Sequence, residues 1–271
     1  MINKKLKHLL FLVLLLSGVS FAANENSSSF THNTYGITGL ITAPSARVQP
    51  DGELSFGLSS EEPFNRLYAS VQFFPWLEAV VRYTEGQYKA YNPGSAQTWK
   101  DKGIDFKIRL LEENGSIPAL SIGFSDFAGT GAYASEYIVA NKMIGNFDFT
   151  LGLGWGSLGE RAHIDNPVGF FSDSFKTRGG GFKGSSLGGT LRLGRFFTGE
   201  SAAFFGGLEY FSPIPNLSLK LEYDSSDYST ELGREKVFYK TGDIFEIDSP
   251  FNIGLNYQLN INQKDKIDFS I

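Results

Sequence analysis

The sequence of 271 residues contains no cysteine. This absence excludes a disulfide-linked scaffold and a metal site with thiolate ligands. It also excludes a lipid anchor joined to a cysteine that follows a signal peptide. A fold without these covalent supports has to be held together by hydrogen bonds and packing.

Long hydrophobic runs are missing as well, except near the N-terminus. Three lysines there precede an apolar stretch at 9–16, and small residues occupy positions 20 and 22. This pattern predicts a signal peptide over residues 1–22, cleaved after Ala22. A membrane-anchor helix is the weaker alternative, because the stretch is short and no basic stop signal follows it. After cleavage, no remaining run is long enough for a spanning helix.

Histidine is rare and positive charge is in deficit, with three histidines and a formal net charge of −5. An acidic chain without a basic run offers no footprint for nucleic acid. His8 leaves with the signal peptide, His32 lies in a disordered-looking leader rich in Asn and Ser, and His163 lies in a long loop. Neither of the last two suggests a serine hydrolase or a metal site. We therefore expect no catalytic residue, no cofactor and no metal.

What the sequence has in abundance is glycine and aromatic residues, arranged with a period of two. In the segment 146–156, Phe147, Phe149, Leu151, Leu153 and Trp155 alternate without exception with small or polar residues. Successive side chains of a strand point to opposite faces, so this segment predicts a strand with one apolar and one polar face.

The same alternation recurs along the chain. It is regular in 54–58, 77–83, 104–110, 120–124, 217–223 and 251–259, and less regular in 65–74, 132–142 and 202–211. Strands of about nine to eleven residues suit a tilted crossing of a bilayer, and aromatic residues near their ends suit its interfaces. Residues 51–271 are therefore predicted to be all-β, a transmembrane antiparallel β-barrel of about 10–12 strands. A soluble two-sheet sandwich is the alternative, since it also gives alternation.

Strand parity assigns the two faces. The candidates for a polar lumen are Glu78, Arg82, Lys107, Arg109, Glu209, Lys220 and Glu222. The residues expected to face lipid are Phe106, Ile108, Leu151, Leu153, Leu219 and Leu221. An ion pair between Glu78 and Arg82 is a possible arrangement on the inward face.

The connections alternate in length, as in outer-membrane barrels with short periplasmic turns and long outer loops. Short turns are expected near 75, 112–116, 145 and 212–216, and long polar loops at 85–102, 157–200 and 225–249. Residues 187–197 are interpreted as a hairpin arm within a loop. Residues 23–50 are interpreted as a periplasmic leader and turn-rich lead-in to the first strand. Alternation continues to residue 271, so the barrel closes on its N-terminal strand, on another chain, or on further sequence.

Residues 36–83 carry a more specific signature. It consists of Gly36-Ile-Thr-Gly-Leu-Ile-Thr-Ala-Pro-Ser-Ala-Arg47, Asp51-Gly-Glu-Leu54, Phe74-Pro-Trp-Leu-Glu78 and Arg82-Tyr83. Further blocks are Gly206-Gly-Leu-Glu-Tyr210, Leu219-Lys-Leu-Glu-Tyr-Asp224 and Ser249-Pro-Phe-Asn-Ile-Gly-Leu-Asn-Tyr257. The chain resembles the YjbH family of exopolysaccharide-biosynthesis outer-membrane proteins. It looks like a short member or an N-terminal part, without the lipoprotein cysteine that is typical of that family.

The resemblance implies a role in making or exporting extracellular polysaccharide or capsule. The expected function is a non-enzymatic channel or scaffold in the Gram-negative outer membrane, after signal-peptide cleavage. Its expected partners are outer-membrane lipid, with polysaccharide and export-machinery proteins as further candidates. A general diffusion pore or surface-binding barrel is the first alternative. An enzyme acting on glycan in the lumen is the second, with carboxylates drawn from Glu78, Glu136, Glu209 and Glu222.

Overall fold

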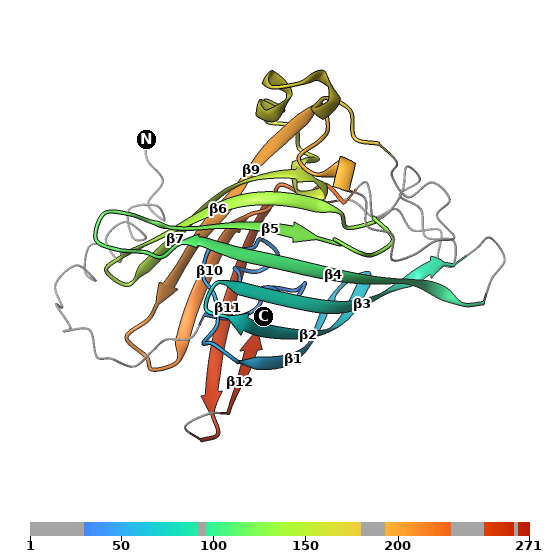
Figure 1. Ribbon diagram of the computed structural model, residues 1–271. Coiled ribbons are helices and arrows are strands. Elements are labelled where there is room, and N and C mark those ends of the chain that lie inside the picture. The colour runs from blue at the N-terminus through green and yellow to red at the C-terminus, as the bar shows by residue number, and fades with distance from the viewer. Residues whose placement is uncertain (1–29, 92–95, 180–192, 229–246, 263–264) are drawn as a thin grey trace, which may run out of the picture.

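The computed structural model describes residues 30–91, 96–179, 193–228, 247–262 and 265–271 (Figure 1). Within these ranges the regular elements are β-strands and short 3-10 helices. The strands are β1 (Leu54–Glu61), β2 (Phe64–Phe74), β3 (Leu77–Ala90), β4 (Thr98–Leu111), β5 (Ala119–Ser125), β6 (Ser135–Ile144), β7 (Phe147–Gly156), β8 (Ile164–Asp165), β9 (Ser201–Phe211), β10 (Leu217–Tyr223), β11 (Phe251–Asn260) and β12 (Lys266–Ser270). The 3-10 helices are η1 (Ser157–Gly159), η2 (Pro167–Phe170), η3 (Asp173–Phe175) and η4 (Leu193–Arg195). In the described parts of the chain, no helix is long and apolar enough to cross a membrane.

All the strands belong to one antiparallel sheet in which neighbours in sequence are neighbours in space. The order runs from β1 to β12, with the two-residue strand β8 paired to β9 beside the main path. The all-β class and the strand count of 10–12 are therefore confirmed. The segments with less regular alternation are also strands, because β2, β6 and β9 cover most of 65–74, 132–142 and 202–211.

The sheet curves strongly without closing (Figure 1). No hydrogen-bonded pairing joins β1 to β12 in the described residues, so closure into a barrel stays a prediction. The two edges of the sheet, at β1 and β12, are nevertheless connected by an ion pair between side chains. Lys266 of β12 forms an ion pair with Glu53, the residue before β1, at 3.0 Å between Nζ and Oε1.

The connections form two ends of different character. At the short-turn end, the strands are joined through 75–76, 112–118, 145–146, 212–216 and 261–265. At the long-loop end they are joined through 62–63, 91–97, 126–134, 157–200 and 224–250.

Two expectations about the connections are corrected by the strands themselves. The long loop expected at 85–102 is wrong, because β3 and β4 extend as a hairpin and leave only 91–97 between them. The described part of 187–197 is not a strand arm. It contains η4, and β7 pairs directly with β9.

The two faces of the sheet have inverted polarity compared with a soluble protein. Large apolar side chains are exposed on the outer face, including Leu58 (82 %), Leu151 (64 %) and Ile253 (81 %). Charged side chains are buried on the concave face, including Glu78 and Lys107. Soluble proteins almost never bury charge in this way unless it is paired. Trp155 departs from the pattern, because it has outward parity but is buried, with its Nε1 donating to Asn166 in the long connection.

Glycines on the concave face make room for aromatic rings from the neighbouring strand. Tyr68, Tyr137 and Phe205 lie directly opposite Gly57, Gly123 and Gly152 in the strand register. A Cβ built on any of these glycines would come within 2.2 Å of the opposite ring. Each aromatic side chain thus covers a glycine across the strand pair, which fixes the register.

Candidate functional site

Residues 30–50, called here the inner segment, lie within the curve of the sheet (Figure 1, blue). They contain no long strand, and their backbone is held by two isolated β-bridges, His32 to Thr38 and Gly39 to Pro44. Gly36 takes a positive φ of 90°, which lets the chain turn tightly between His32 and Thr38. The sequence predicted a periplasmic leader and lead-in over 23–50. Residues 23–29 lie outside the described residues, and the rest contact buried side chains of the sheet.

Glu222 of β10 binds three successive backbone N–H groups of the inner segment. The donors are Ile41 (2.8 Å), Thr42 (3.0 Å) and Ala43 (2.9 Å), and the Thr42 hydroxyl adds a fourth bond at 2.5 Å. Consecutive N–H groups that converge in this way form a concave site for an anion. The buried carboxylate therefore receives charge-assisted hydrogen bonds from a part of the chain about 180 residues away.

Lys220 binds the backbone carbonyl groups of the same segment. Its Nζ donates to the carbonyl oxygens of Gly39 and Leu40, both at 2.9 Å, and to the Thr31 hydroxyl at 2.5 Å. Lys220 and Glu222 are two residues apart on β10, so both point to the concave face. Strand β10 thus contributes Lys220 as a donor to the backbone carbonyls of the inner segment and Glu222 as an acceptor for its backbone N–H groups.

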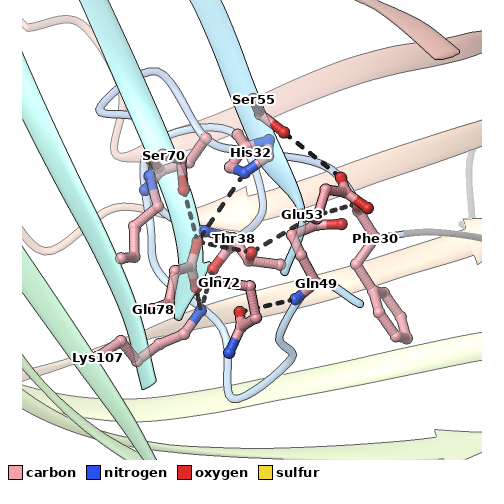
Figure 2. A network of polar contacts seen from close by, with 12 residues as sticks. Phe30, His32, Thr38, Gln49, Glu53, Ser55, Ser70, Gln72, Glu78 and Lys107 are labelled. Atoms are coloured by element: carbon pink, nitrogen blue, oxygen red, sulfur yellow. Dashed lines mark hydrogen bonds and ion pairs between the residues drawn. The ribbon is translucent and has the colours of Figure 1, made fainter. Parts of the chain in front are cut away.

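Glu78 of β3 and Lys107 of β4 form a second anchor, at Thr38 of the inner segment (Figure 2). They are directly paired in the strand register, and their side chains meet at 2.7 Å. Glu78 accepts from the backbone and hydroxyl of Thr38, each at 2.8 Å, and Lys107 donates to the Thr38 carbonyl at 3.0 Å. A buried ion pair is stable only if further hydrogen bonds satisfy its remaining polar atoms. Thr38 of the inner segment supplies these bonds to Glu78 and Lys107.

A third anchor holds the last residues of the inner segment. Arg47 makes a bidentate contact with Asp148 of β7, at 3.0 and 2.6 Å, and reaches Glu113 at 2.6 Å. Asn141 of β6 accepts from the Ala46 backbone at 2.7 Å. The anchors come from strands on different sides of the sheet, so the inner segment joins them across the concave space.

The remaining lumen candidates have other partners. Arg82 is buried beside Asp105 of β4, and its guanidinium lies 5.0 Å from the Tyr35 ring and 4.9 Å from the Tyr133 ring. Glu209 accepts from Ser218 at 2.5 Å. Arg109 is partly exposed near the short-turn end, 3.8 Å from Glu112.

The ion pair between Glu78 and Arg82 does not form. Glu78 pairs with Lys107 and Arg82 with Asp105. Residues four apart on one strand are about 13 Å apart, whereas residues opposite each other on adjacent strands are about 5 Å apart. Parity therefore placed both side chains on one face, but the partners had to come from the next strand.

The two histidines of the described region are placed differently from each other. His32 is buried 3.9 Å from Glu78, and burial lowers its pKa, so it belongs to an ordered segment rather than the disordered leader that its neighbours suggested. His163 is exposed, and its ring contacts the Tyr223 hydroxyl at 3.0 Å and the Phe204 N–H at 3.0 Å. Across the part of the chain that the structure describes, no group of three His, Asp or Glu side chains is arranged to hold a metal ion.

Asp224, directly after β10, is a buried carboxyl whose ionisation opposes folding. Burial, followed by repulsion from Glu222, raises its pKa to about 7. In the unfolded chain the pKa of an Asp is about 4. Between about pH 4 and pH 7, Asp224 is therefore protonated in the folded protein and ionised in the unfolded chain. The contribution of Asp224 to stability is thus complete below about pH 4 and is lost as the pH rises to about 7.

We expect Asp224→Asn to flatten this decline in stability, because the amide does not titrate. The measurement is the midpoint of thermal unfolding in detergent, monitored by circular dichroism at about pH 4.5 and at about pH 7.5. The exposed Asp51→Asn variant is the control. An Asp224→Asn midpoint that falls between the two pH values as far as the parent's would contradict the expectation.

The comparison with known families adds to this geometry. A family model described as "Exopolysaccharide biosynthesis protein YbjH" matches residues 31–269. The chain belongs to the YjbH family. The match begins within the inner segment and ends in β12, so the anchors and the strands of this YjbH-family chain lie in the matched region.

A curated relative supports the same membership. The "Uncharacterized lipoprotein YjbH" of Escherichia coli (strain K12) is 36% identical over 265 residues, covering 94% of this chain and 37% of the relative. The YjbH-family chain described here therefore spans about a third of that relative's length. No solved structure matches it.

Sequence reasoning placed charge on the concave face but missed what the charges bind. The signal was present as turn-forming residues in 36–52 next to a polar face with buried charges of both signs. A buried charge needs a partner, and in this YjbH-family chain the backbone of the inner segment supplies it.

Proposed function

We propose that this chain is an outer-membrane β-barrel component of exopolysaccharide or capsule biosynthesis and export. It acts without catalysis, as a channel or scaffold. In this proposal residues 1–22 are a signal peptide, the strands cross the Gram-negative outer membrane, and the apolar outer face contacts lipid. Polysaccharide and other export-machinery proteins are the proposed partners.

The observation that carries the proposal is the inverted polarity of the sheet in a member of an exopolysaccharide-biosynthesis family. Phe149, Leu151, Leu219, Leu221 and Ile253 are exposed on strands whose alternate residues are buried and polar. In water, an apolar surface of this extent is a liability for aggregation. In a bilayer it is the expected outer surface of a barrel.

Strand length and aromatic placement also support a membrane location. β2, β6, β7, β9 and β11 have 10 or 11 residues, close to the 9–11 of a tilted transmembrane strand. Phe73, Phe74 and Trp76 are exposed at the short-turn end, and the rings of Phe74 and Trp76 stack at 5.4 Å. Amphipathic rings in this position suit the bilayer interface.

The inner segment favours a structure that is closed at rest. It occupies the concave face and is bound through Glu78, Lys107, Lys220 and Glu222. A general diffusion pore would need a concave face that is open to water. A concave face covered by the inner segment is instead expected of a scaffold, or of a channel that opens only when the segment moves. The anchors use the carboxylates Glu78 and Glu222 to bind backbone, which supports a non-enzymatic role for both.

Deletion of the gene tests the proposal. In a strain that makes the polymer, deletion should reduce surface and released polysaccharide to near background, and the wild-type gene on a plasmid should restore it. The carbohydrate is measured on washed cells and in the culture supernatant. Unchanged polysaccharide in both fractions would contradict the proposed function and favour a general pore.

A further inference from the structure

A pocket lies where the inner segment meets the long-loop end of the sheet. It has about 450 Å³ of empty space, part of it open to solvent, and is lined by the inner segment, by β3, β5 and β6, and by the residues after β10. The outer-membrane proposal puts the same end outside the cell, where an exported polymer emerges.

The lining combines aromatic rings with hydroxyl, amide and carboxyl groups. Tyr35, Tyr133 and Tyr228 contribute rings, and Asn33 and Asp224 contribute polar groups. Serines 125, 135, 157 and 226 add four hydroxyls. A sugar ring has C–H faces that pack on aromatic rings and hydroxyls that need both donors and acceptors.

A second pocket shares a wall with the first. Asp224 and Tyr228 line both, and the second is completed by residues that include Phe64, Arg161 and Asn252. The Tyr228 hydroxyl donates to Asp224 at 2.9 Å, so the dividing wall is held in place. Two adjoining pockets suit a ligand made of repeated units.

Tyr228 is also held in an unusual backbone conformation. Its φ is +59°, in the left-handed region that a residue with a bulky side chain seldom adopts. Such conformations cost about 1–3 kcal/mol and cluster at ligand-binding sites, where the surrounding structure maintains them. The strained residue is thus one of the two whose side chains line both pockets, the other being Asp224.

We propose that the two pockets around Tyr228 form a binding site for uncharged sugar units of an oligosaccharide or polysaccharide. The inference rests on the proposed function and names its ligand. Uncharged sugars are favoured over uronic acids because Glu61, Glu62 and Asp224 line the pockets, while Arg82 is already paired with Asp105. Arg161 is the other cation of the two linings.

Binding to the full chain, folded in detergent, tests the inference. The probes are oligosaccharides from a partial acid hydrolysate of the producing strain's exopolysaccharide, separated into neutral and acidic fractions. Calorimetry should detect saturable binding of the neutral fraction, weakened roughly tenfold or more by Tyr228→Ala, as for a buried aromatic contact. Tyr91→Ala, a tyrosine at the same end but outside both pockets, should bind like the parent.

The conservative variants Tyr228→Phe and Asp224→Asn protect the test against misfolding of Tyr228→Ala. Each keeps the shape of the wall. Tyr228→Phe removes the hydroxyl that donates to Asp224, and Asp224→Asn replaces the carboxyl acceptor by a weaker amide acceptor, so each should weaken binding while circular dichroism stays unchanged. No binding of neutral oligosaccharides by the parent overturns the inference, as does equal binding by the parent and all three variants. Tighter binding of the acidic fraction overturns the ligand class.

The result is distinguishable from a failure of the proposed function. Loss of surface polysaccharide on gene deletion, without binding by the purified chain, overturns the site and leaves the function. Binding by the purified chain, with unchanged polysaccharide in the deletion strain, overturns the function and leaves the site.

Discussion

Replacing Leu151 by arginine should prevent most of the protein from assembling in the outer membrane. Leu151 lies at the middle of β7 and is 64 % exposed, whereas its sequence neighbours Thr150 and Gly152 are buried. In the proposed orientation its side chain meets lipid near the midplane, where arginine costs about 2–4 kcal/mol. The measurement is the amount of protein in urea-washed outer membranes that keeps a heat-modifiable mobility on gels.

The matched control is Phe170→Arg. Phe170 is 90 % exposed in η2 of the 157–200 connection, so the same kind of exchange there places arginine in water. This variant should assemble like the parent. Equal assembly of Leu151→Arg and the parent would mean that the outer face of β7 does not contact lipid.

Replacing Glu222 by alanine should release the inner segment and open a path along the concave face. The change leaves the N–H groups of Ile41, Thr42 and Ala43 without their carboxylate. Each buried donor that loses its partner costs about 1–3 kcal/mol, so the segment loses its strongest anchor on β10. Conductance in planar bilayers should rise from near zero in the parent to frequent openings in the variant.

Glu209→Ala is the control for a buried carboxylate on the same face. Glu209 accepts from Ser218 on the adjacent strand, and the bond lies within the sheet rather than at the inner segment. This variant should stay as closed as the parent. If Glu222→Ala also stays closed, the inner segment does not block the path and a scaffold role without conduction is favoured.

The strands could be predicted because their alternation is a local property of the sequence. In β7 every second residue is apolar, and the exposed and buried positions follow the predicted parity as far as Gly152. The hairpin of β3 and β4 was shortened in the prediction because the sequence from Thr84 to Lys102 is mostly polar and lacks a regular apolar alternation. Polar strands that extend past an apolar band look like loops when only hydrophobic periodicity is considered.

The partners of the buried charges could not be predicted because they depend on contacts far apart in sequence. Glu222 lies about 180 residues from Thr42, and Lys220 about the same distance from Leu40. Parity gives a side chain its face but not the strand register or the course of an irregular segment. Parity therefore placed Lys220 only on a polar lumen wall, whereas the structure gives it three bonds to the inner segment.

The most direct test of the central claim is whether the outer face of the sheet contacts lipid. The chain has no cysteine, so nitroxide labels can be attached to Phe149→Cys, Leu151→Cys and Ile253→Cys in reconstituted membranes, with Phe170→Cys as the water-exposed reference. We predict that the first three collide often with oxygen and seldom with an aqueous nickel chelate, while the reference does the reverse. Nickel chelate reaching positions 149, 151 and 253 as readily as position 170 would contradict the account.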